Sequence, residues 1–195
     1  MGDEATIVEQ APLQDRDLLR RLSDYFDAFD ARRRQGQGWL IFNASGGRSG
    51  RIASFIRYRL ADYEPDVSSY LMPWRDFALN SYVNQVGLRA LKPSAGRDHL
   101  SKREFELATR VTHNTWAQMI STDLLVVIGM KPHHRHEAEL LDRTLEGRYE
   151  QRLATILLTP EMPHDLAAEF ETVDPTQTYW PRIFQRMYET SLVAL

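Results

Sequence analysis

The sequence contains no cysteine among its 195 residues. Without thiols the chain can form neither a disulfide framework nor a thiolate metal site, and nothing supports secretion. It also has no run near the ~18 consecutive apolar residues that a membrane span needs. The first ten residues, MGDEATIVEQ, are acidic and short of apolar residues, unlike a signal peptide. We therefore expect a cytoplasmic protein with no membrane partner.

The chain also has no strong excess of one charge, because 24 basic and 27 acidic residues leave a net charge of −3. Nothing in this balance demands a nucleic-acid partner, although contact with DNA stays open. A hydrophobic fraction of 43% is enough for one sizeable core. We expect a flexible lead over residues 1–12 and a single domain over residues 13–195.

Short apolar runs alternate along the chain with segments of helical periodicity. The expected strands cover residues 40–42, 67–72, 123–130 and 153–159. The expected helices cover residues 18–29, 51–60, 77–83, 105–119 and 138–149, with a loop over residues 91–99. In the last helix, Tyr149 is expected to face the core. Glu146 and Glu150 are expected to lie on the polar face, partnered with Arg143 and Arg148. The alternation predicts a three-layer α/β fold with a mainly parallel sheet.

A Gly/Ser/Arg-rich segment joins the first strand to the next helix, in WLIFNASGGRSGR over residues 39–51. A phosphate-binding loop occupies such a position, but its pattern GxxxxGK[ST] requires a lysine and a hydroxyl residue. Ending the pattern on Gly50 puts Arg51 and Ile52 there, and moving it back by one residue puts Gly50 and Arg51 there.

Backbone N–H groups in such a turn attract anions even without the lysine. The segment therefore predicts a weak nucleotide or phosphate site at Gly46, Gly47, Arg48, Ser49, Gly50 and Arg51. The alternative is a retained turn whose arginines are solvated or salt-bridged.

The segment HHRHE, which ends in Glu137, offers three imidazoles. Its spacing does not match the i, i+4 histidines of HExxH, so we expect an exposed loop and no metal site. No GxSxG or Cys/His arrangement supports nucleophilic catalysis.

Three further segments occur in a recognisable order: DLLVVIGM at residues 123–130, EGRYEQRLATILLTPEMP at 146–163 and RIFQRMYET at 182–190. Together they resemble the ATPase domain of bacterial and phage replication helicase loaders and of the related transposition helper ATPases, within the AAA+ class. The matching family segments are a DLLIIDDLG strand, an RY-containing helix followed by PTIxTSN, and RIxxRL. The resemblance covers the chain from about Leu18 onward and implies a P-loop NTPase fold of AAA+ type.

The departures from this family fall on catalytic positions. The two acidic residues that hold Mg²⁺ and polarise water in the family are replaced by Ile128 and Gly129, and the polar sensor falls on Pro160. Because phosphoryl transfer depends on Mg²⁺ and on positioning of the γ-phosphate, we expect no catalytic residues. ATP or ADP could still be held without efficient hydrolysis.

The resemblance also implies a role for the arginines of RIFQRMYET. In loaders an arginine of this segment reaches the γ-phosphate of a neighbouring subunit, and Arg186 matches that place, with Arg182 beside it. The alternative is a helix that packs its apolar side chains inward and leaves both arginines in water.

These observations predict a hydrolysis-deficient AAA+-like protein that acts as an interaction subunit in DNA replication, recombination or transposition. Its partner would be a cognate ATPase, a helicase or a recombination or transposition protein, in a homo- or hetero-oligomer. Since the chain ends soon after RIFQRMYET, we expect no helical lid subdomain. One alternative is a working ATPase that uses Arg51 in place of lysine and borrows Asp123 or Glu161. Another is a scaffold subunit with no nucleotide role.

Overall fold

A five-stranded sheet forms the centre of the molecule. The computed structural model describes residues 4–87 and 99–195. Within these residues all strands run parallel, in the order β2-β3-β4-β1-β5. Their bounds are Gly38–Ile41 for β1, Ser69–Pro73 for β2, Leu124–Ile128 for β3, Ala154–Leu158 for β4 and Ser191–Ala194 for β5. The predicted α/β fold with a mainly parallel sheet is confirmed.

The three central strands are buried on both faces, which explains their mainly apolar sequences. Every residue of β1 and β4 is buried. In the register of the sheet, Leu40 lies beside Leu157 and Val126 beside Ile156. Burial on both faces removes the polar alternation that half-exposed strands show.

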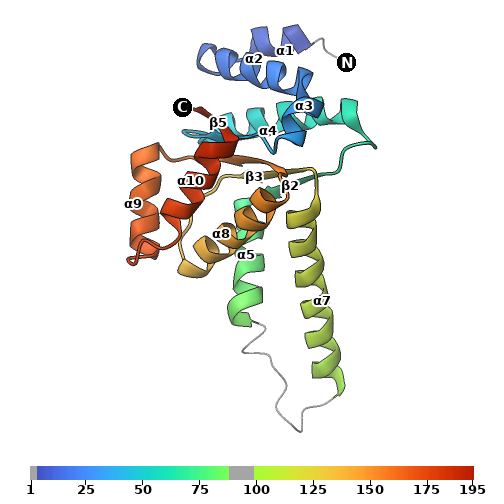
Figure 1. Cartoon of the computed structure of the whole chain (residues 1–195), viewed down its shortest axis with the longest axis vertical. Coiled ribbons are helices and arrows are strands. Elements are labelled where there is room, and N and C mark those ends of the chain that lie inside the picture. The colour runs from blue at the N-terminus through green and yellow to red at the C-terminus, as the bar shows by residue number, and fades with distance from the viewer. Residues whose placement is uncertain (1–3, 88–98) are drawn as a thin grey trace.

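Helices cover both faces of the sheet and give three layers (Figure 1). One face carries α1 (Glu4–Gln10), α2 (Leu13–Asp27), α3 (Phe29–Arg34) and α4 (Gly46–Leu60). The other carries α5 (Trp74–Tyr82), α7 (His99–Ser121), α8 (Arg135–Glu150), α9 (Pro163–Val173) and α10 (Trp180–Thr190). Short turns η1 (Ala61–Tyr63) and η2 (Val83–Gly87) follow α4 and α5. Trp39 and Ile41 enter the first core and Leu40 the second, as strand alternation requires.

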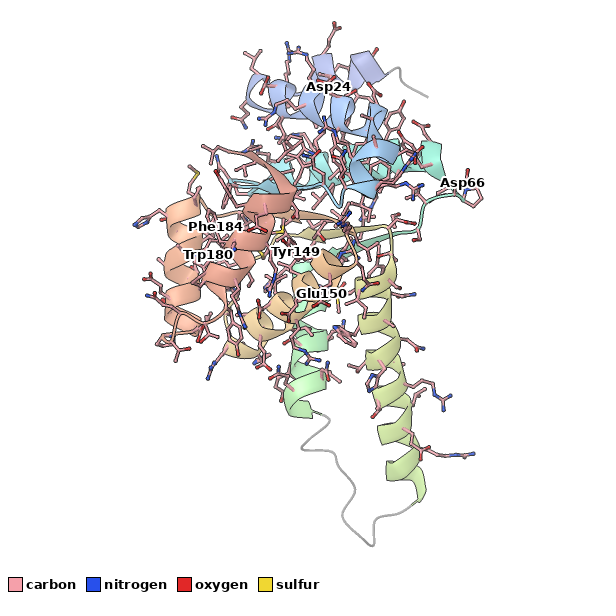
Figure 2. All side chains as sticks on the ribbon, in the orientation of Figure 1. Asp24, Asp66, Tyr149, Glu150, Trp180 and Phe184 are labelled. Carbon is pink, nitrogen blue, oxygen red and sulfur yellow. The ribbon has the colours of Figure 1, made fainter. Side chains whose placement is uncertain are left out.

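Several predicted boundaries differ from those of the structure. Helix α4 begins at Gly46 rather than Arg51, so the glycine-rich segment is its first turn. Residues 1–12 were expected to be a flexible lead, but Glu4–Gln10 form α1, and Ile7 packs against the core. The predicted loop over residues 91–99 lies outside the described residues, apart from His99 at the start of α7. On α8, Tyr149 is 43% exposed instead of facing the core (Figure 2).

Arg148 also differs from the prediction, because it is buried and does not pair with Glu146 or Glu150. Its guanidinium donates to the Met119 and Thr122 carbonyls at the end of α7, at 2.7 and 3.0 Å, and to the Thr155 hydroxyl of β4 at 2.9 Å. The last carbonyls of a helix have no partner within the helix, so this side chain supplies the missing donors. Arg148 thereby fixes the end of α7 against β4.

Candidate functional site

The glycine-rich connection between β1 and α4 lies at the carboxyl edge of the sheet. Two of its residues have left-handed backbone angles, Asn43 with φ of 53° and Gly46 with φ of 51°. A glycine adopts this conformation without the steric cost that a Cβ brings, so Gly46 lets the chain turn directly into α4. The connection therefore has the position that a phosphate-binding loop requires.

The backbone N–H groups of the connection are directed into the protein. Phe42 donates to the Ala194 carbonyl at 2.9 Å, Asn43 to the Glu161 carbonyl at 3.0 Å and Ala44 to the Thr159 carbonyl at 2.8 Å. A phosphate cradle needs such groups to point at the ligand. These three N–H groups are therefore not directed at a ligand, and in the first turn of α4 the Arg48 N–H is bonded to the Ser45 carbonyl at 3.1 Å.

Arg48 turns inward from that first turn and is 8% exposed. Its guanidinium donates to the Asp15 carboxylate at 2.9 Å, to the Asn43 carbonyl at 2.9 Å and to the Leu195 carbonyl at 3.1 Å. One side chain thus joins α2, the β1–α4 connection and the residue that follows β5. This agrees with the alternative interpretation, in which the arginines of the turn are salt-bridged.

Arg51 reaches the same carboxylate one turn later on α4. Its Nε and Nη2 atoms lie 2.9 and 2.6 Å from Asp15 Oδ2. The Asp15 side chain is fully buried, whereas the Arg51 side chain is 41% exposed. The Asp15 carboxylate therefore accepts from two guanidinium groups, those of Arg48 and Arg51.

Two neighbouring cavities open beside this cluster. One, of about 470 Å³, is polar and includes Gln14, Asn43 and Ser45 in its lining. The other, of about 590 Å³, is a mainly apolar groove between α1–α2 and α4. Gly47 and Arg51 line both cavities, so the two spaces adjoin at the start of α4.

Strand β3, which β4 separates from β1, ends without an acidic residue. Ile128 closes the strand, and Gly129 follows with φ of 78°. Further on, the Lys131 Nζ atom lies 2.7 Å from Glu161 Oε1 and 3.2 Å from Glu169 Oε1. The hydrogen bond to Glu161 is the main reason that the pKa of Lys131 is raised. Glu161 lies near the loop, because its backbone carbonyl accepts the Asn43 N–H, but its carboxylate is paired with Lys131.

Asp123 is the other carboxylate that a working ATPase was expected to borrow, and it lies at the opposite edge of the sheet. It precedes β3 and accepts hydrogen bonds from the Ser68 hydroxyl at 2.7 Å and from Arg33 at 3.2 Å. Burial by itself would raise its pKa, but these hydrogen bonds and the charge of Arg33 lower it overall. The expectation that Asp123 serves the loop is wrong, because the loop adjoins the carboxyl ends of the strands.

The two arginines of α10 are engaged within the chain. Arg182 and Arg186 each lie 2.5 Å from one oxygen of Asp142 on α8, and Arg186 also lies 3.1 Å from Glu146. The Asp142 side chain is 3% exposed and that of Arg186 is 16% exposed. A role in a neighbouring subunit stays a prediction and requires these ion pairs to open.

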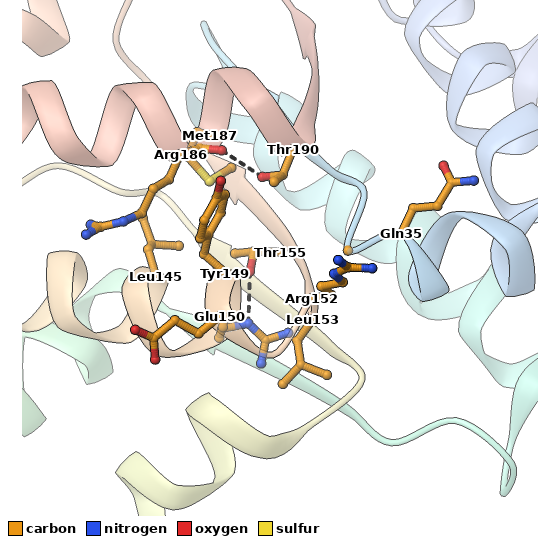
Figure 3. A pocket seen from close by; sticks show the side chains of 12 residues that line it. Gln35, Leu145, Tyr149, Glu150, Arg152, Leu153, Thr155, Arg186, Met187 and Thr190 are labelled. Atoms are coloured by element: carbon orange, nitrogen blue, oxygen red, sulfur yellow. Dashed lines mark hydrogen bonds between the residues drawn. The ribbon is translucent and has the colours of Figure 1, made fainter.

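Arg186 also borders a cavity of about 530 Å³ that sequence reasoning missed (Figure 3). Tyr149, Arg152, Met187 and Thr190 line it as well, where α8 and α10 meet the start of β4. Arg148 is a further lining residue, and burial lowers its pKa to about 10. No local sequence signal marks this space, since it arises from the packing of separate segments.

The histidine-rich segment begins a helix. The Glu137 carboxylate accepts a hydrogen bond from the His133 backbone N–H at 2.8 Å. The rings of His134 and His136 are stacked, with 5.2 Å between their centroids. Burial is the main cause of the lowered pKa of His136. Across residues 4–87 and 99–195, no three His, Asp or Glu side chains are grouped as a metal site would require.

None of the helices in the same ranges combines the length and hydrophobicity needed to cross a membrane.

Solved structures with the same arrangement include that of the DnaC helicase loader. It matches with a TM-score of 0.62 and 11% identity, over 95% of this chain and 92% of that chain. The chain has the fold of a helicase loader. A putative primosome component from Streptococcus pyogenes serotype M3 matches with a TM-score of 0.58 and 12% identity, over 94% and 80% of the two chains. The structure of DnaI matches with a TM-score of 0.57 and 16% identity, over 99% of this chain and 94% of that chain.

The expected P-loop NTPase-like fold of the helicase-loader type is therefore confirmed. No protein-family model matches the chain, and no curated protein sequence matches it. At identities of 11–16% the helicase-loader fold is what the chain shares with these structures.

Proposed function

We propose that this chain is a hydrolysis-deficient AAA+-like protein of the helicase-loader type. In this proposal it acts as a protein-interaction subunit in DNA replication, recombination or transposition. The similarity to a helicase loader and to a putative primosome component supports this field of action. The partner would be a cognate ATPase, a helicase or a recombination or transposition protein.

One observation is the main support for the proposed lack of ATP hydrolysis. Next to the β1–α4 connection, where an ATPase needs room for phosphates, Arg48 of α4 forms a buried ion pair with Asp15 of α2. The N–H groups of the connection at Phe42, Asn43 and Ala44 are bonded to backbone carbonyls of other segments. A nucleotide at this place would have to compete with contacts that the protein already makes.

The chemistry of the neighbouring strands supports the same proposal. Phosphoryl transfer needs Mg²⁺ held near the γ-phosphate and a group that positions water. Ile128 and Gly129 provide no carboxylate after β3, and Pro160 has no side-chain donor after β4. Glu161, the acidic residue nearest to the loop among those considered, is paired with Lys131.

Magnesium-dependent ATP turnover by the purified protein tests the proposal. We expect no turnover above that of a protein-free control. The comparison should include Arg51→Ala and, as its match, Arg57→Ala, which removes an exposed arginine of the same helix. Turnover that disappears with Arg51→Ala and survives Arg57→Ala would establish the competing function, an ATPase that uses Arg51 in place of lysine.

A further inference from the structure

We infer that this chain forms a two-fold symmetric dimer through the open edge of its sheet. Strand β5 of one copy pairs antiparallel with β5 of a second copy, so that the two sheets join into one. The flank of α10 beside this edge supplies the side-chain contacts. The inference goes beyond the proposed function, because it involves neither the β1–α4 connection nor a nucleotide.

The outer side of β5 is an unpaired strand edge. Strand β5 ends the sheet beside β1, and no strand within residues 4–87 and 99–195 lies on its other side. The Ala194 carbonyl accepts a hydrogen bond from the Phe42 N–H, just after β1. Since successive residues of a strand direct their backbone groups to opposite sides, Val193 directs its N–H and C=O away from β1. The exposed Arg21 side chain reaches the Val193 carbonyl at 3.2 Å, which agrees with this direction.

The sequence of this edge suits pairing with a second copy. The segment SLVAL, over residues 191–195, contains no charged residue, proline or glycine. Charged residues and proline commonly protect strand edges from pairing with another chain. A two-fold axis sets Val193 opposite its own copy, and like charges there would repel, whereas a neutral edge can pair with itself. The contact with Arg21 does not block the edge, because a carbonyl oxygen can accept two hydrogen bonds.

The flank of α10 beside the edge carries exposed aromatic side chains. Phe184 is 42% exposed and Tyr188 is 71% exposed, and their stacked rings have centroids 6.1 Å apart. Arg182 and Arg186, two residues before each ring, bind Asp142 of α8. Since a helix turns by about 100° per residue, side chains two positions apart lie on opposite flanks, so both rings face away from α8. Helix α10 packs on β1 and β5, whereas α8 packs on β4, so this outer flank lies at the β5 edge.

The Val193 side chain lies on the same face of the sheet as α10. Leu192 and Ala194 pack against the core on the opposite face, so strand alternation turns Val193 toward the α10 layer. Val193 is 42% exposed there. When two sheets join at this edge, the two copies of α10 lie side by side, and Phe184, Tyr188 and Val193 face the same residues of the second copy.

The surface available at this edge predicts a weak, reversible dimer. Since a buried aromatic side chain covers roughly 150–250 Å², the exposed parts of Phe184 and Tyr188 offer on the order of 200 Å² per copy. Val193, Leu195 and the strand backbone add to this area. Weak complexes bury less than about 600 Å² per partner. The two Arg21 side chains also approach the axis and repel each other, so we expect a dissociation constant in the micromolar range.

Sedimentation equilibrium of the wild type at increasing protein concentration tests the dimer. We expect monomers and dimers without larger species, because a two-fold interface closes on itself. Val193→Lys should weaken dimerisation at least about tenfold, since it sets two like charges opposite each other. Val111→Lys is the matched control, because Val111 is an exposed valine of α7. A wild type that stays monomeric at millimolar concentration, or equal constants for the two variants, would overturn the inference.

Tyr188→Ala tests the helix contact separately. It should weaken dimerisation about tenfold, as expected for a central interface tyrosine. Tyr82→Ala removes another exposed tyrosine, on α5, and should leave the dimer unchanged. An unchanged constant for Tyr188→Ala would overturn the placement of α10 in the interface.

The absence of cysteine from the sequence allows a direct test of the register. Val193→Cys carries a single thiol, and directly opposed residues of an antiparallel pair have Cα atoms about 5.5 Å apart, within disulfide range. Mild oxidation should therefore link two copies of Val193→Cys several times faster than two copies of Val111→Cys. Equal rates would overturn the pairing at Val193.

Hydrogen exchange in the wild type provides a measurement that does not depend on any variant. The Val193 amide should exchange more slowly as the protein concentration rises, because it becomes bonded across the two-fold axis. An exchange rate that does not change with concentration would overturn the inference. None of these measurements involves ATP, so turnover by the wild type would refute the proposed function and leave the dimer to be decided separately.

Discussion

The Nη1 atom of Arg186 lies 2.5 Å from the Oδ1 atom of Asp142. Asp142 is buried on α8 and binds Arg182 through its other oxygen, so one carboxylate clamps two turns of α10. The same residues that the family resemblance assigns to a subunit interface therefore also hold two helices of the domain together. Stability and any interface role must be separated by experiment.

Replacing Asp142 with asparagine should lower the free energy of unfolding by about 1–3 kcal/mol, because charge-assisted hydrogen bonds are lost and Arg186 stays partly buried. Glu146→Gln is the control, since Glu146 also binds Arg186 but is 49% exposed. Its effect should stay below about 1 kcal/mol, as for exposed ion pairs. Urea denaturation measures both. Equal losses in the two variants would mean that burial of Asp142 adds nothing to the clamp.

Two glycines of the β1–α4 segment should respond to alanine in opposite directions. Gly46 has φ of 51°, so alanine there should destabilise the protein by about 1–2 kcal/mol. Gly50 lies inside α4 with no atom within 4 Å of an added Cβ, so alanine there should stabilise it by about 0.5–1 kcal/mol. Thermal unfolding of both variants gives the comparison. The same sign for both would contradict the backbone conformation described for the start of α4.

Strands β1 to β4 and the helices α2, α4, α5, α7 and α8 could be predicted from the sequence, because central parallel strands are mainly apolar and helices repeat with a period near 3.6. The edge strand β5 and the helices α1 and α9 were not predicted. Helix α4 shows where such reasoning ends. Its first turn is rich in glycine, which reads as a loop, but tertiary contacts of Arg48 hold it in helical form. The boundary error follows from contacts between residues 33 positions apart, Asp15 and Arg48.

The sequence patterns did not predict which charged residues are buried. Arg148 lies between Glu146 and Glu150, so the sequence favoured an exposed polar face of the helix. Instead, the Arg148 side chain is buried and donates to carbonyl oxygens of α7 and β4. Asp15 likewise occupies an ordinary amphipathic helix. The assignment of Ile128, Gly129 and Pro160 to altered catalytic positions stays a prediction, since it rests on order along the chain rather than on packing.

Asp123 should make stability fall more steeply in acid. Its folded-state pKa lies below the ordinary value, so its contribution is fully present above the unfolded pKa, near about 4. The contribution is lost as the pH falls through the lower folded value. The melting temperature of Asp123→Asn should therefore depend less on pH than that of the wild type between about pH 5 and pH 2. Asp17→Asn, which removes an exposed carboxylate, should follow the wild-type curve.

The role of Arg186 in trans can be measured only with a partner ATPase that assembles with this chain. In such an assembly, Arg186→Ala should reduce the partner's ATP turnover by up to the ~10³-fold or more that arginine fingers contribute. Arg182→Ala should have a smaller effect, because Arg186 is the residue that matches the finger position of the family and Arg182 shares only its contact with Asp142. Both substitutions remove one ion pair to the same carboxylate, so Arg182→Ala also controls for loosening of α10.

Assembly of each variant must first be verified by sedimentation, because a complex that has come apart also loses turnover. Asp142→Asn supplies the remaining control. It removes the ion pair with Asp142 and keeps the guanidinium and its exposed contact with Glu146. A finger limited by the pair with Asp142 should therefore raise the partner's turnover in this variant. If Arg186→Ala assembles normally and the partner's turnover is unchanged, Arg186 serves only to hold α10 against α8.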